Sequence, residues 1–491
     1  HNTSGGFMDI GQFFTAADLL GISPEIILTL TALAVLSLEM LHVSRPGIKL
    51  MVAALGFLLA GAVTISTSGD EQILFGGMLS LNKFSMFFDF LYISIGLATM
   101  ILSQGYLEKM GSKSRGEYPA LILFAIIGMM LMTKANDLVM VFLGLELLSL
   151  SLYVLVGFLR HNLYSNESGL KYLLLGAFAT GFFLFGAAMI YGATGTTNYN
   201  EIASAATSGS ILSKVYFSLG IGLLLIGFAF KVALVPFHMW SPDVYQGAPT
   251  TVTAFLCTAP KVAGFGALLN IFIVAFMEIQ VEWQNLFWIL AALTMTVGNI
   301  SALMQSHVKR MLAFSSVSHA GYLVLGVLVL NSVGLSAVLF YLVVYSVMNL
   351  GAFGIILLLE KDNKGLAFED YRGFSAQHPW MAGAMALFMI SLAGFPPTGG
   401  FVAKYGLLSS AVSEGYIWLV IIAVLNTLVS AYYYLRLIVN MYMQEEKESP
   451  HPVSGVLVLG LIGLLAVIVL TFGINPEILL KITAETATTV F

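Results

Sequence analysis

Long apolar stretches alternate with short polar ones along almost the whole chain. A membrane helix needs about 20 apolar residues to cross a hydrocarbon core of about 30 Å. About fourteen stretches reach or approach that length, at roughly 24–42, 48–66, 84–103, 119–133, 136–158, 168–191, 212–238, 251–277, 284–305, 310–330, 333–359, 379–411, 416–442 and 453–473. The pattern predicts an all-α polytopic membrane protein with about fourteen transmembrane helices.

Two of these stretches are too long for one straight helix. Residues 212–238 would form about 40 Å of helix and residues 379–411 about 50 Å. Pro236 interrupts the first stretch, and the run GFPPTGG at 394–400 interrupts the second. Paired interrupted helices are typical of inverted repeats that place a site near the membrane midplane. Because the breaks are five stretches apart, we expect two inverted five-helix repeats, with helices 7 and 12 discontinuous.

This arrangement predicts four regions. They are an N-terminal three-helix region at 1–118, a first repeat at 119–277, a second repeat at 284–442, and a last helix with its tail at 443–491. The opening His1–Gly6 is polar and lacks a signal-peptide pattern. We expect it to be a cloning remnant or a processed end, with the native start at Met8.

Composition supports a membrane location and narrows the chemistry. The 491 residues are 58% hydrophobic and only 10% charged, more apolar than one soluble core could accommodate. The single cysteine, Cys257, excludes disulfides and thiolate-bound iron–sulfur clusters built from this chain alone. No glycine-rich nucleotide fingerprint follows a strand-like segment, and the histidines lack metal-ligand spacing. We therefore predict neither a cofactor nor a metal in this chain, and no nucleic-acid partner.

The basic residues predict which face is cytoplasmic, since lysine and arginine favour cytoplasmic loops. The odd-numbered loops carry Arg45, Lys49, Lys109, Lys113, Arg115, Arg160, Lys309, Arg310, Lys361, Lys364, Arg372 and Lys447. The even-numbered loops and the tail carry only Lys83, Lys134, Lys214 and Lys481. Both termini are therefore expected on the outer side of the membrane.

Four charged residues lie deep inside the apolar stretches. A charge at the bilayer centre costs roughly 2.5–3.5 kcal/mol on insertion scales and usually faces a bundle interior or a polar cavity. Glu146 and Lys261 lie about 15 Å into their helices, Lys231 precedes the break at Pro236, and Lys404 follows the second break by one turn. These four residues are predicted to form a proton relay. The alternatives are a neutral hydrogen-bonded carboxyl for Glu146, a snorkelling Lys231 and an interfacial Lys404, whereas Lys261 lies too deep to snorkel easily.

Other polar groups have weaker support as relay members. Lys171 lies only one turn inside its stretch, so snorkelling competes with a relay role. His238, His307 and His319 lie near helix ends or serine clusters, where a structural role competes with proton transfer.

The remaining charged and aromatic groups are expected to have simple structural roles. We interpret Asp89, Glu39 and Arg436 as interfacial or helix-packing charges, the tyrosines at 432–434 as an aromatic belt, and the charged segment 360–372 as a solvated loop with a short amphipathic helix.

The relay would work through changes in spacing between charges. Burial disfavours the charged form of a lysine, and a nearby carboxylate favours it. Movement of Glu146 relative to Lys231 would hold or release a proton, which would then pass to Lys261 and Lys404. Moving one charge against 100 mV requires about 2.3 kcal/mol. Because no redox or nucleotide site is evident in the sequence, we expect partner subunits to supply that energy.

Three sequence motifs resemble a known family. The run FKVALVPFHMWSPDVYQGAP at 230–249 resembles the signature of the antiporter-like subunits of respiratory complex I. SSVSHAGY at 315–322 and GFPPTGGF at 394–401 are similar to two further family motifs. The resemblance spans roughly 120–440 and is strongest for the N-type subunits of bacterial NADH–quinone oxidoreductase. Lys404 stands where M-type subunits have glutamate, and the long lateral helix of L-type subunits is not expected.

The resemblance implies a non-redox subunit that translocates protons while NADH reduces quinone elsewhere in the complex. Glu146, Lys231, Lys261 and Lys404 match the family's charged residues on helices five, seven, eight and twelve, and Lys171 matches a lysine on helix six of N-type chains. Flavin, iron–sulfur clusters and quinone are implied in partner subunits. The implied surroundings are the other membrane subunits of complex I and the lipid bilayer of the bacterial inner (cytoplasmic) membrane.

Two alternatives remain open at this point. A subunit of a multi-subunit cation/proton antiporter would share the lysine relay and the broken helices. A structural scaffold would use its buried charges only to fix helix packing, as buried ion pairs can do.

Overall fold

Helices form almost all of the described chain in the computed structural model, which describes residues 15–43, 46–67, 71–106, 116–360, 365–445 and 455–490. Thirteen helices in these residues are long and apolar enough to cross a membrane. They are α2 (Ser23–Met40), α3 (Pro46–Ser66), α4 (Lys83–Leu102), α6 (Glu117–Lys134), α7 (Leu138–Val156), α8 (Leu163–Thr194), α10 (Lys214–Val232), α12 (Thr250–Val274), α13 (Gln280–Leu303), α14 (Val308–Val329), α15 (Ser332–Leu359), α19 (Ile417–Met443) and α20 (Val456–Ile474).

Two shorter apolar helices complete the predicted set of fourteen. These are α17 (Pro379–Ala393) and α18 (Gly399–Ser413), which together fill the long stretch at 379–411. The prediction of an all-α membrane protein with about fourteen crossings is therefore confirmed, with the twelfth crossing split in two.

The small elements were not all expected. They are α1 (Ala16–Gly21), α9 (Tyr199–Ser208), α11 (Trp240–Gly247), α16 (Phe374–Gln377), α21 (Glu477–Thr488), the 3-10 turns η2 (Phe75–Gly77), η3 (Met277–Ile279) and η4 (Phe368–Tyr371), and the strands β1 (Gln72–Leu74) and β2 (Leu79–Leu81). The apolar pattern predicted neither the antiparallel β1–β2 hairpin nor α1, α9 and α21, because these elements are too short or too polar to span a bilayer.

Polar residues between the apolar stretches start several helices. Asn82 caps α4 by accepting from the backbone N–H of Ser85 at 2.9 Å. Asp137 caps α7 through the N–H of Val139 at 2.8 Å. A side-chain oxygen at this position satisfies one of the first four backbone donors of a helix, which have no partner within it. The loop polarity thus sets where the membrane helices begin.

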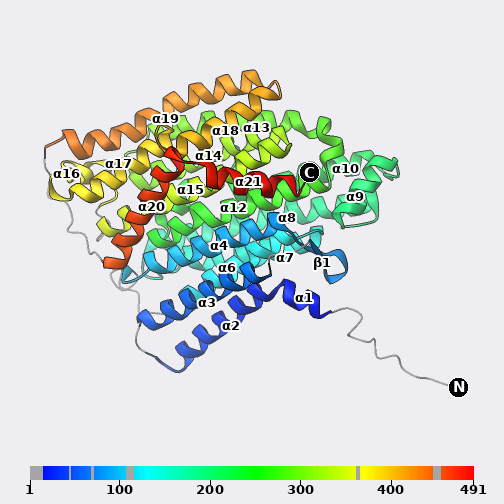
Figure 1. Ribbon diagram of the computed structural model, residues 1–491, viewed down its shortest axis with the longest axis horizontal. Coiled ribbons are helices and arrows are strands. Elements are labelled where there is room, and N and C mark those ends of the chain that lie inside the picture. The colour runs from blue at the N-terminus through cyan, green and yellow to red at the C-terminus, as the bar shows by residue number, and fades with distance from the viewer. Residues whose placement is uncertain are drawn as a thin grey trace.

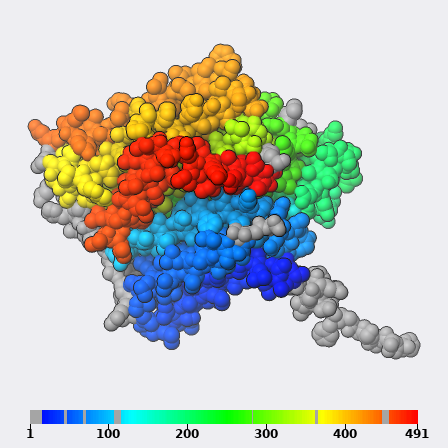
Figure 2. Space-filling model, viewed as in Figure 1, coloured from blue at the N-terminus to red at the C-terminus, as the bar shows by residue number. Residues whose placement is uncertain are grey.

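The helices stack as a broad bundle with α2 and α3 at one margin and α19 at the other (Figure 1). Between these margins, α12, α14 and α15 pack on one another and are almost entirely buried. The C-terminal helices α20 and α21 both pack on α15, and Figure 2 shows them in red on the surface of the bundle. The core therefore consists of helices that are apolar on all sides and surrounded by protein.

The order in which helices pack repeats along the chain. In the first half, α6 packs on α7, α7 on α8, α8 on α10 and α11, α10 on α12, and α12 on α6. In the second half, α13 packs on α14, α14 on α15, α15 on α17 and α18, α17 on α19, and α19 on α13. Each second pair lies five crossings after the first, which supports the two five-helix repeats.

The two predicted breaks lie at corresponding places in this pattern. The residue directly after α10 is Ala233, which has a left-handed backbone with φ of 61°, and the residue directly after α17 is Gly394, with φ of 88°. The chain becomes helical again in α11 after the first break and in α18 after the second. The backbone N–H of Val235 donates to Thr294 Oγ1 at 3.0 Å, so neighbouring helices satisfy groups that the first break frees.

The bundle has two opposite faces, the hairpin face and the basic face. The hairpin face holds β1–β2 and residues 135–137, joined by a bridge between Leu79 and Ala135. The basic face lies at the opposite helix ends and holds Arg160, Lys309, Arg310 and Arg372. The opening His1–Met8 lies outside the described residues. So do several of the basic residues that predict the cytoplasmic face, namely Arg45, Lys109, Lys113, Arg115, Lys361, Lys364 and Lys447.

Two expectations from the sequence are wrong in part. Tyr432 is exposed as a belt residue would be, but Tyr433 and Tyr434 are buried, and Tyr433 donates to Asn299 Oδ1 at 2.9 Å. Successive helix residues point in different directions, so one helix cannot present three adjacent side chains to lipid. In the segment 360–372, Glu360 is buried instead of solvated. Its carboxylate accepts from Tyr106 at 2.7 Å and from Thr250 at 2.5 Å.

Gly400 should be essential to the second break. A Cβ atom at this position would lie 1.8 Å from the carbonyl oxygen of Ser391, so Gly400→Ala must separate α17 from α18. We expect destabilisation at the upper end of the overpacking range of about 1–3 kcal/mol, measured as a lower unfolding temperature of the purified protein assembly.

The matched control lies on the same half-helix. A Cβ at Gly406 would lie 3.6 Å from Ala337, an ordinary contact, so Gly406→Ala should leave the unfolding temperature nearly unchanged. Equal unfolding temperatures for the two variants would contradict the close packing of the break.

Candidate functional site

Lys231 lies at the first break, in the last turn of α10, and is only 5% exposed. Its Nζ donates to Ser149 Oγ on α7 at 2.9 Å. The break itself is held by the indole N–H of Trp240, which donates to the carbonyl of Phe230 at 2.9 Å. A lysine therefore sits beside unwound backbone inside the bundle and does not extend to the surface.

Glu146 lies on the same helix as Ser149, one turn earlier, and is half-buried. No ion pair joins it to Lys231 in the described structure, and its charge acts on the lysine only at longer range. The structure therefore shows no direct pairing of this carboxylate with the lysine, and their functional relation stays a prediction. A small shift of α7 or α10 would change their separation.

Lys261 lies in the middle of α12, directly after Pro260, and is 2% exposed. Its Nζ donates to the carbonyl oxygen of Ser316 on α14 and, at 2.5 Å, to the Oγ of the same serine. Tyr345 on α15 donates to that Oγ at 2.8 Å, and its ring centroid lies 5.6 Å from the ammonium. Three almost entirely buried helices thus converge on one cation.

Helix α12 also contacts Lys231. A Cβ at Gly264, three residues after Lys261, would lie 3.6 Å from Cγ of Lys231. The stem of Lys231 therefore packs against the backbone of the helix that carries Lys261. No direct hydrogen bond joins the two ammonium groups among the contacts of the described residues.

His319 lies on α14, three residues after Ser316, and is buried. Its Nδ1 shares a hydrogen bond of 2.5 Å with the hydroxyl of Tyr341, and its Nε2 one of 3.1 Å with the hydroxyl of Tyr434. Its ring lies 5.4 Å from that of Tyr345 and 6.2 Å from that of Tyr322. The imidazole therefore stands between the tyrosine beside Lys261 and the tyrosine beside Lys404.

Lys404 lies in α18 just after the second break and is 5% exposed. Its Nζ donates to the carbonyl oxygen of Ala393, the last residue of α17, at 3.0 Å. The same ammonium lies 5.0 Å from the ring centroid of Tyr322. The cation thus folds back onto the C-terminal end of the preceding half-helix, where positive charge is stabilised.

We call Lys231, Lys261, His319 and Lys404 the central line. Each ammonium is bonded to a hydroxyl or carbonyl oxygen and not to a carboxylate. Hydroxyl and imidazole groups can both donate and accept a hydrogen bond, so they can pass a proton on. The arrangement therefore has the groups that a proton path needs.

Two predicted candidates lie apart from the central line. Lys171 is half-exposed near the basic face, 2.7 Å from Glu167 and 3.0 Å from Asp243. Partial burial raises the pKa of Asp243, but Arg310 and Lys171 more than offset this and hold it below its ordinary value. His238 lies in the first break, half-buried, and its Nδ1 has no hydrogen-bond partner.

His307 precedes α14 at the basic face. Burial, followed by the neighbouring Lys309, lowers the pKa of His307 to about 4. The imidazole is therefore neutral over the physiological range, which favours the structural role over proton transfer at this position.

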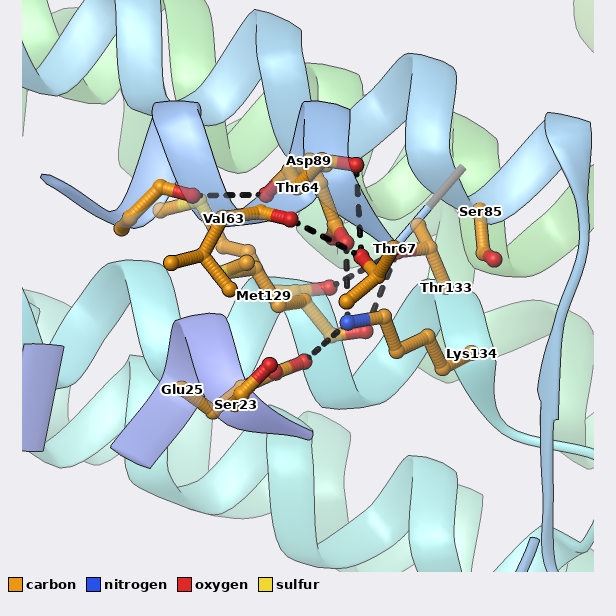
Figure 3. A network of polar contacts seen from close by, with 12 residues as sticks. Ser23, Glu25, Val63, Thr64, Thr67, Ser85, Asp89, Met129, Thr133 and Lys134 are labelled. Atoms are coloured by element: carbon orange, nitrogen blue, oxygen red, sulfur yellow. Dashed lines mark hydrogen bonds and ion pairs between the residues drawn. The ribbon is translucent and has the colours of Figure 1, made fainter. Parts of the chain in front are cut away.

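Several polar groups of the site are not evident from the sequence. Ser149, Tyr341, Tyr345 and Tyr434 hold the central line but resemble ordinary core residues in the sequence. Lys134 was expected in a loop, which is wrong, and Asp89, expected as an interfacial or helix-packing charge, is buried between helices and not interfacial. Figure 3 shows them with Glu25 in one buried cluster. A charge inside the apolar stretch 84–103 was the available signal for Asp89.

Metal chemistry has no evident site in this part of the protein. In the described ranges, no group of three or more His, Cys, Asp or Glu side chains is arranged to hold a metal ion. Cys257 is buried, and its Sγ lies 3.2 Å from the hydroxyl of Tyr345.

The chain matches a known family over most of its length. The family model described as "NADH:quinone oxidoreductase/Mrp antiporter, TM" matches residues 135–430. NADH-quinone oxidoreductase subunit N of Trichlorobacter lovleyi is 46% identical over 90% of this chain and 91% of its own length. NADH-quinone oxidoreductase subunit N 1 of Chloroherpeton thalassium is 42% identical over 88% of this chain and 91% of its own length.

Solved structures give the same result. A chain of respiratory complex I from Thermus thermophilus is 34% identical, covers 93% of this chain and 98% of its own length, and has a TM-score of 0.80. A chain of the Mrp complex from Dietzia sp. has a TM-score of 0.85 at 21% identity, over 96% and 97% of the two chains, and so shares the fold. This chain belongs to the family of antiporter-like membrane subunits of NADH:quinone oxidoreductase, and resembles its subunit N members over nearly their full length.

Proposed function

We propose that this chain is a non-redox membrane subunit of an NADH–quinone oxidoreductase and moves protons across the membrane along the central line. The observation that carries the proposal is Lys261. It is a buried ammonium at the meeting point of three almost entirely buried helices, with serine and tyrosine as its partners instead of a carboxylate. A purely structural cation would be expected to have a paired counter-charge, because a buried unpaired charge is costly.

Glu146 and Lys231 form the first station of this proposed path. The carboxylate favours the protonated lysine when the two are close, and burial favours release when they separate. The proton leaves Nζ of Lys231 as the N–H bond breaks, and a new N–H bond forms at Lys261. His319 then accepts on one ring nitrogen and releases from the other, and Lys404 is the last station.

His238 and Lys171 have supporting parts in the proposal. The unpaired Nδ1 of His238 faces the first break, where a proton could enter. Lys171 is tied to the surface cluster of Asp243 and Arg310, so we assign it the positioning of α8 against α11.

The regions and the orientation belong to the same proposal. Residues 119–277 and 284–442 would be the two inverted repeats, flanked by 1–118 and 443–491. The basic residues favour a cytoplasmic location for the basic face and an outer location for both termini, in a bacterial inner membrane. The energy would come from partner subunits that hold flavin, iron–sulfur clusters and quinone.

The cation/proton antiporter is the second candidate, because the matched family model includes Mrp antiporters and the fold is shared with the Mrp complex. Identity to that structure is 21%, against 46% to a subunit N relative. Purification of the tagged chain with its partners separates the two. NADH-driven quinone reduction supports the first candidate. Cation-dependent proton exchange without NADH supports the second.

Loss of the Lys261 ammonium should stop transport. We expect Lys261→Ala to leave the complex assembled and to reduce NADH-driven acidification of vesicles to near background, since the proton has no acceptor between Lys231 and His319. The measurement compares the pH change in inverted membrane vesicles with the rate of NADH oxidation in the same preparation.

Lys214→Ala is the control for a lysine removed from the surface. Lys214 is exposed at the start of α10, so its removal should change neither quantity. Normal acidification by Lys261→Ala would refute the proposed path, and loss of assembly in that variant alone would favour the structural scaffold.

Replacement of His319 should separate the two halves of the path. His319→Phe keeps an aromatic ring but removes both tyrosine hydrogen bonds, so we expect proton transport to fall severalfold while Lys231 and Lys261 remain in place. The readout is again protons moved per NADH oxidised.

Tyr433→Phe serves as the matched control, because this hydroxyl donates to Asn299 and does not contact the histidine. An equal loss in the two variants would mean that disturbed packing near α19, and not proton transfer by His319, causes the effect.

A further inference from the structure

Three charged residues from three helices meet near the hairpin face, away from the central line. Glu25 lies in the first turn of α2, Asp89 in the second turn of α4, and Lys134 is the last residue of α6. Nζ of Lys134 contacts Oε1 of Glu25 and lies 2.8 Å from Oδ2 of Asp89. Figure 3 shows the ammonium between the two carboxylates. We call these three residues the triad.

The triad is enclosed by protein. Glu25 is 4% exposed, and Asp89 and Lys134 are 0% exposed. The neighbouring side chains are uncharged: Thr64 from α3, Thr67 directly after α3, Thr133 from α6 and Ser85 from α4 (Figure 3). Tyr92 on α4 is another titratable group near Asp89 of the triad, and its hydroxyl has no hydrogen-bond partner.

The charges of the triad do not balance. Two carboxylates and one ammonium leave a net charge of −1 in a buried site, and no further cation among the described residues contacts either acid. The other ion pair of α2, between Glu39 and Lys49 of α3, lies about 21 Å further along the helix and is balanced. Burying a net charge is costly, so the neutral state of the triad holds one additional proton.

The structure also shows where that proton would bind. Oε2 of Glu25 and Oδ1 of Asp89 are buried without a hydrogen-bond partner. A protonated carboxyl group has an O–H at such an oxygen, whereas a metal ion would need several more oxygen ligands and would face the ammonium at contact distance. A proton is therefore the ligand that fits.

The triad is linked to the helix that carries Lys261. Asn270 on α12 donates through Nδ2 to the carbonyl of Ala135 at 2.6 Å, next to Lys134. Helix α12 packs on both α4 and α6. Lys261 and Asn270 are nine residues apart on α12, which is about 14 Å along the helix. A shift of α12 would therefore change the surroundings of both Lys261 and the triad.

We infer that the triad is a second proton-binding site of this subunit, which takes up and releases one proton near the hairpin face during the transport cycle. The inference rests on the proposed function. An O–H bond forms on Glu25 or Asp89 when the proton arrives and breaks when it leaves, while Lys134 keeps its proton throughout. The bound proton neutralises the site, and its release restores the net negative charge.

Asp89→Asn in the complete complex tests this inference. The amide copies the neutral form of the acid and leaves a balanced pair of Glu25 and Lys134, so the complex should assemble and oxidise NADH normally when uncoupled. We expect protons moved per NADH to fall by half or more. Infrared difference spectra should also lose a carboxylic acid C=O band that shifts in D₂O.

Glu39→Gln is the matched control, because it removes a carboxylate from a balanced pair on α2, the helix that also carries Glu25 of the triad. It should leave protons per NADH unchanged. Transport at the wild-type level in Asp89→Asn would overturn the inference, because a site that only fixes packing tolerates the neutral isostere. Dependence of transport on sodium instead of on the carboxyl group would also overturn it.

A second variant covers failure of the first to assemble. Glu25→Gln leaves the balanced pair of Asp89 and Lys134 and should give the same loss. If neither variant assembles, the inference is wrong, since each copies the protonated state. Lys261→Ala distinguishes this outcome from failure of the proposed function. If Lys261→Ala abolishes transport and Asp89→Asn does not, only the triad inference fails.

Discussion

The contact between Lys261 and Ser316 is the interaction on which the account of this protein depends. A positive charge buried among α12, α14 and α15 would cost several kcal/mol if left without partners. Ser316 provides a carbonyl and a hydroxyl to the same ammonium, and Tyr345 orients that hydroxyl. Neutral oxygens stabilise the cation without fixing its protonation state as tightly as a carboxylate would. The site is therefore suited to gain and lose a proton.

The broken helices extend this arrangement to both sides. A continuous helix engages most of its carbonyls in its own hydrogen bonds, whereas an interrupted helix leaves its last carbonyls without a partner inside the helix. At the second break, the carbonyl of Ala393 binds Lys404, and at the first break Lys231 lies in the last turn before Ala233. The matching order of helix packing in the two halves places one break on each side of α12, α14 and α15. At the second break, a backbone carbonyl thus stabilises a lysine that has no carboxylate partner.

Sequence predicts this fold well because the bilayer restricts it. Apolar stretches near 20 residues have one stable outcome in lipid, and the two stretches that exceed the bilayer thickness contain their own breakers, Pro236 and the run at 394–400. Lys231, Lys261 and Lys404 are detectable for a related reason, since a charge in such a stretch is rare. Hydroxyl partners such as Ser316 and Tyr434 are not, because serine and tyrosine also occur in ordinary cores. Lys134 was misplaced since a lysine at the end of a stretch has the same pattern whether it faces water or two buried acids.

The central claim is that protons move between buried lysines that are not directly hydrogen-bonded to one another. The most direct measurement is a high-resolution cryo-electron microscopy structure of the active complex in lipid, with the ordered waters resolved. We predict waters that bridge Lys231 to Lys261 and His319 to Lys404, completing the hydrogen-bonded path through Ser316 and the tyrosines. Close apolar packing in both gaps, with no water in any state of the catalytic cycle, would contradict it.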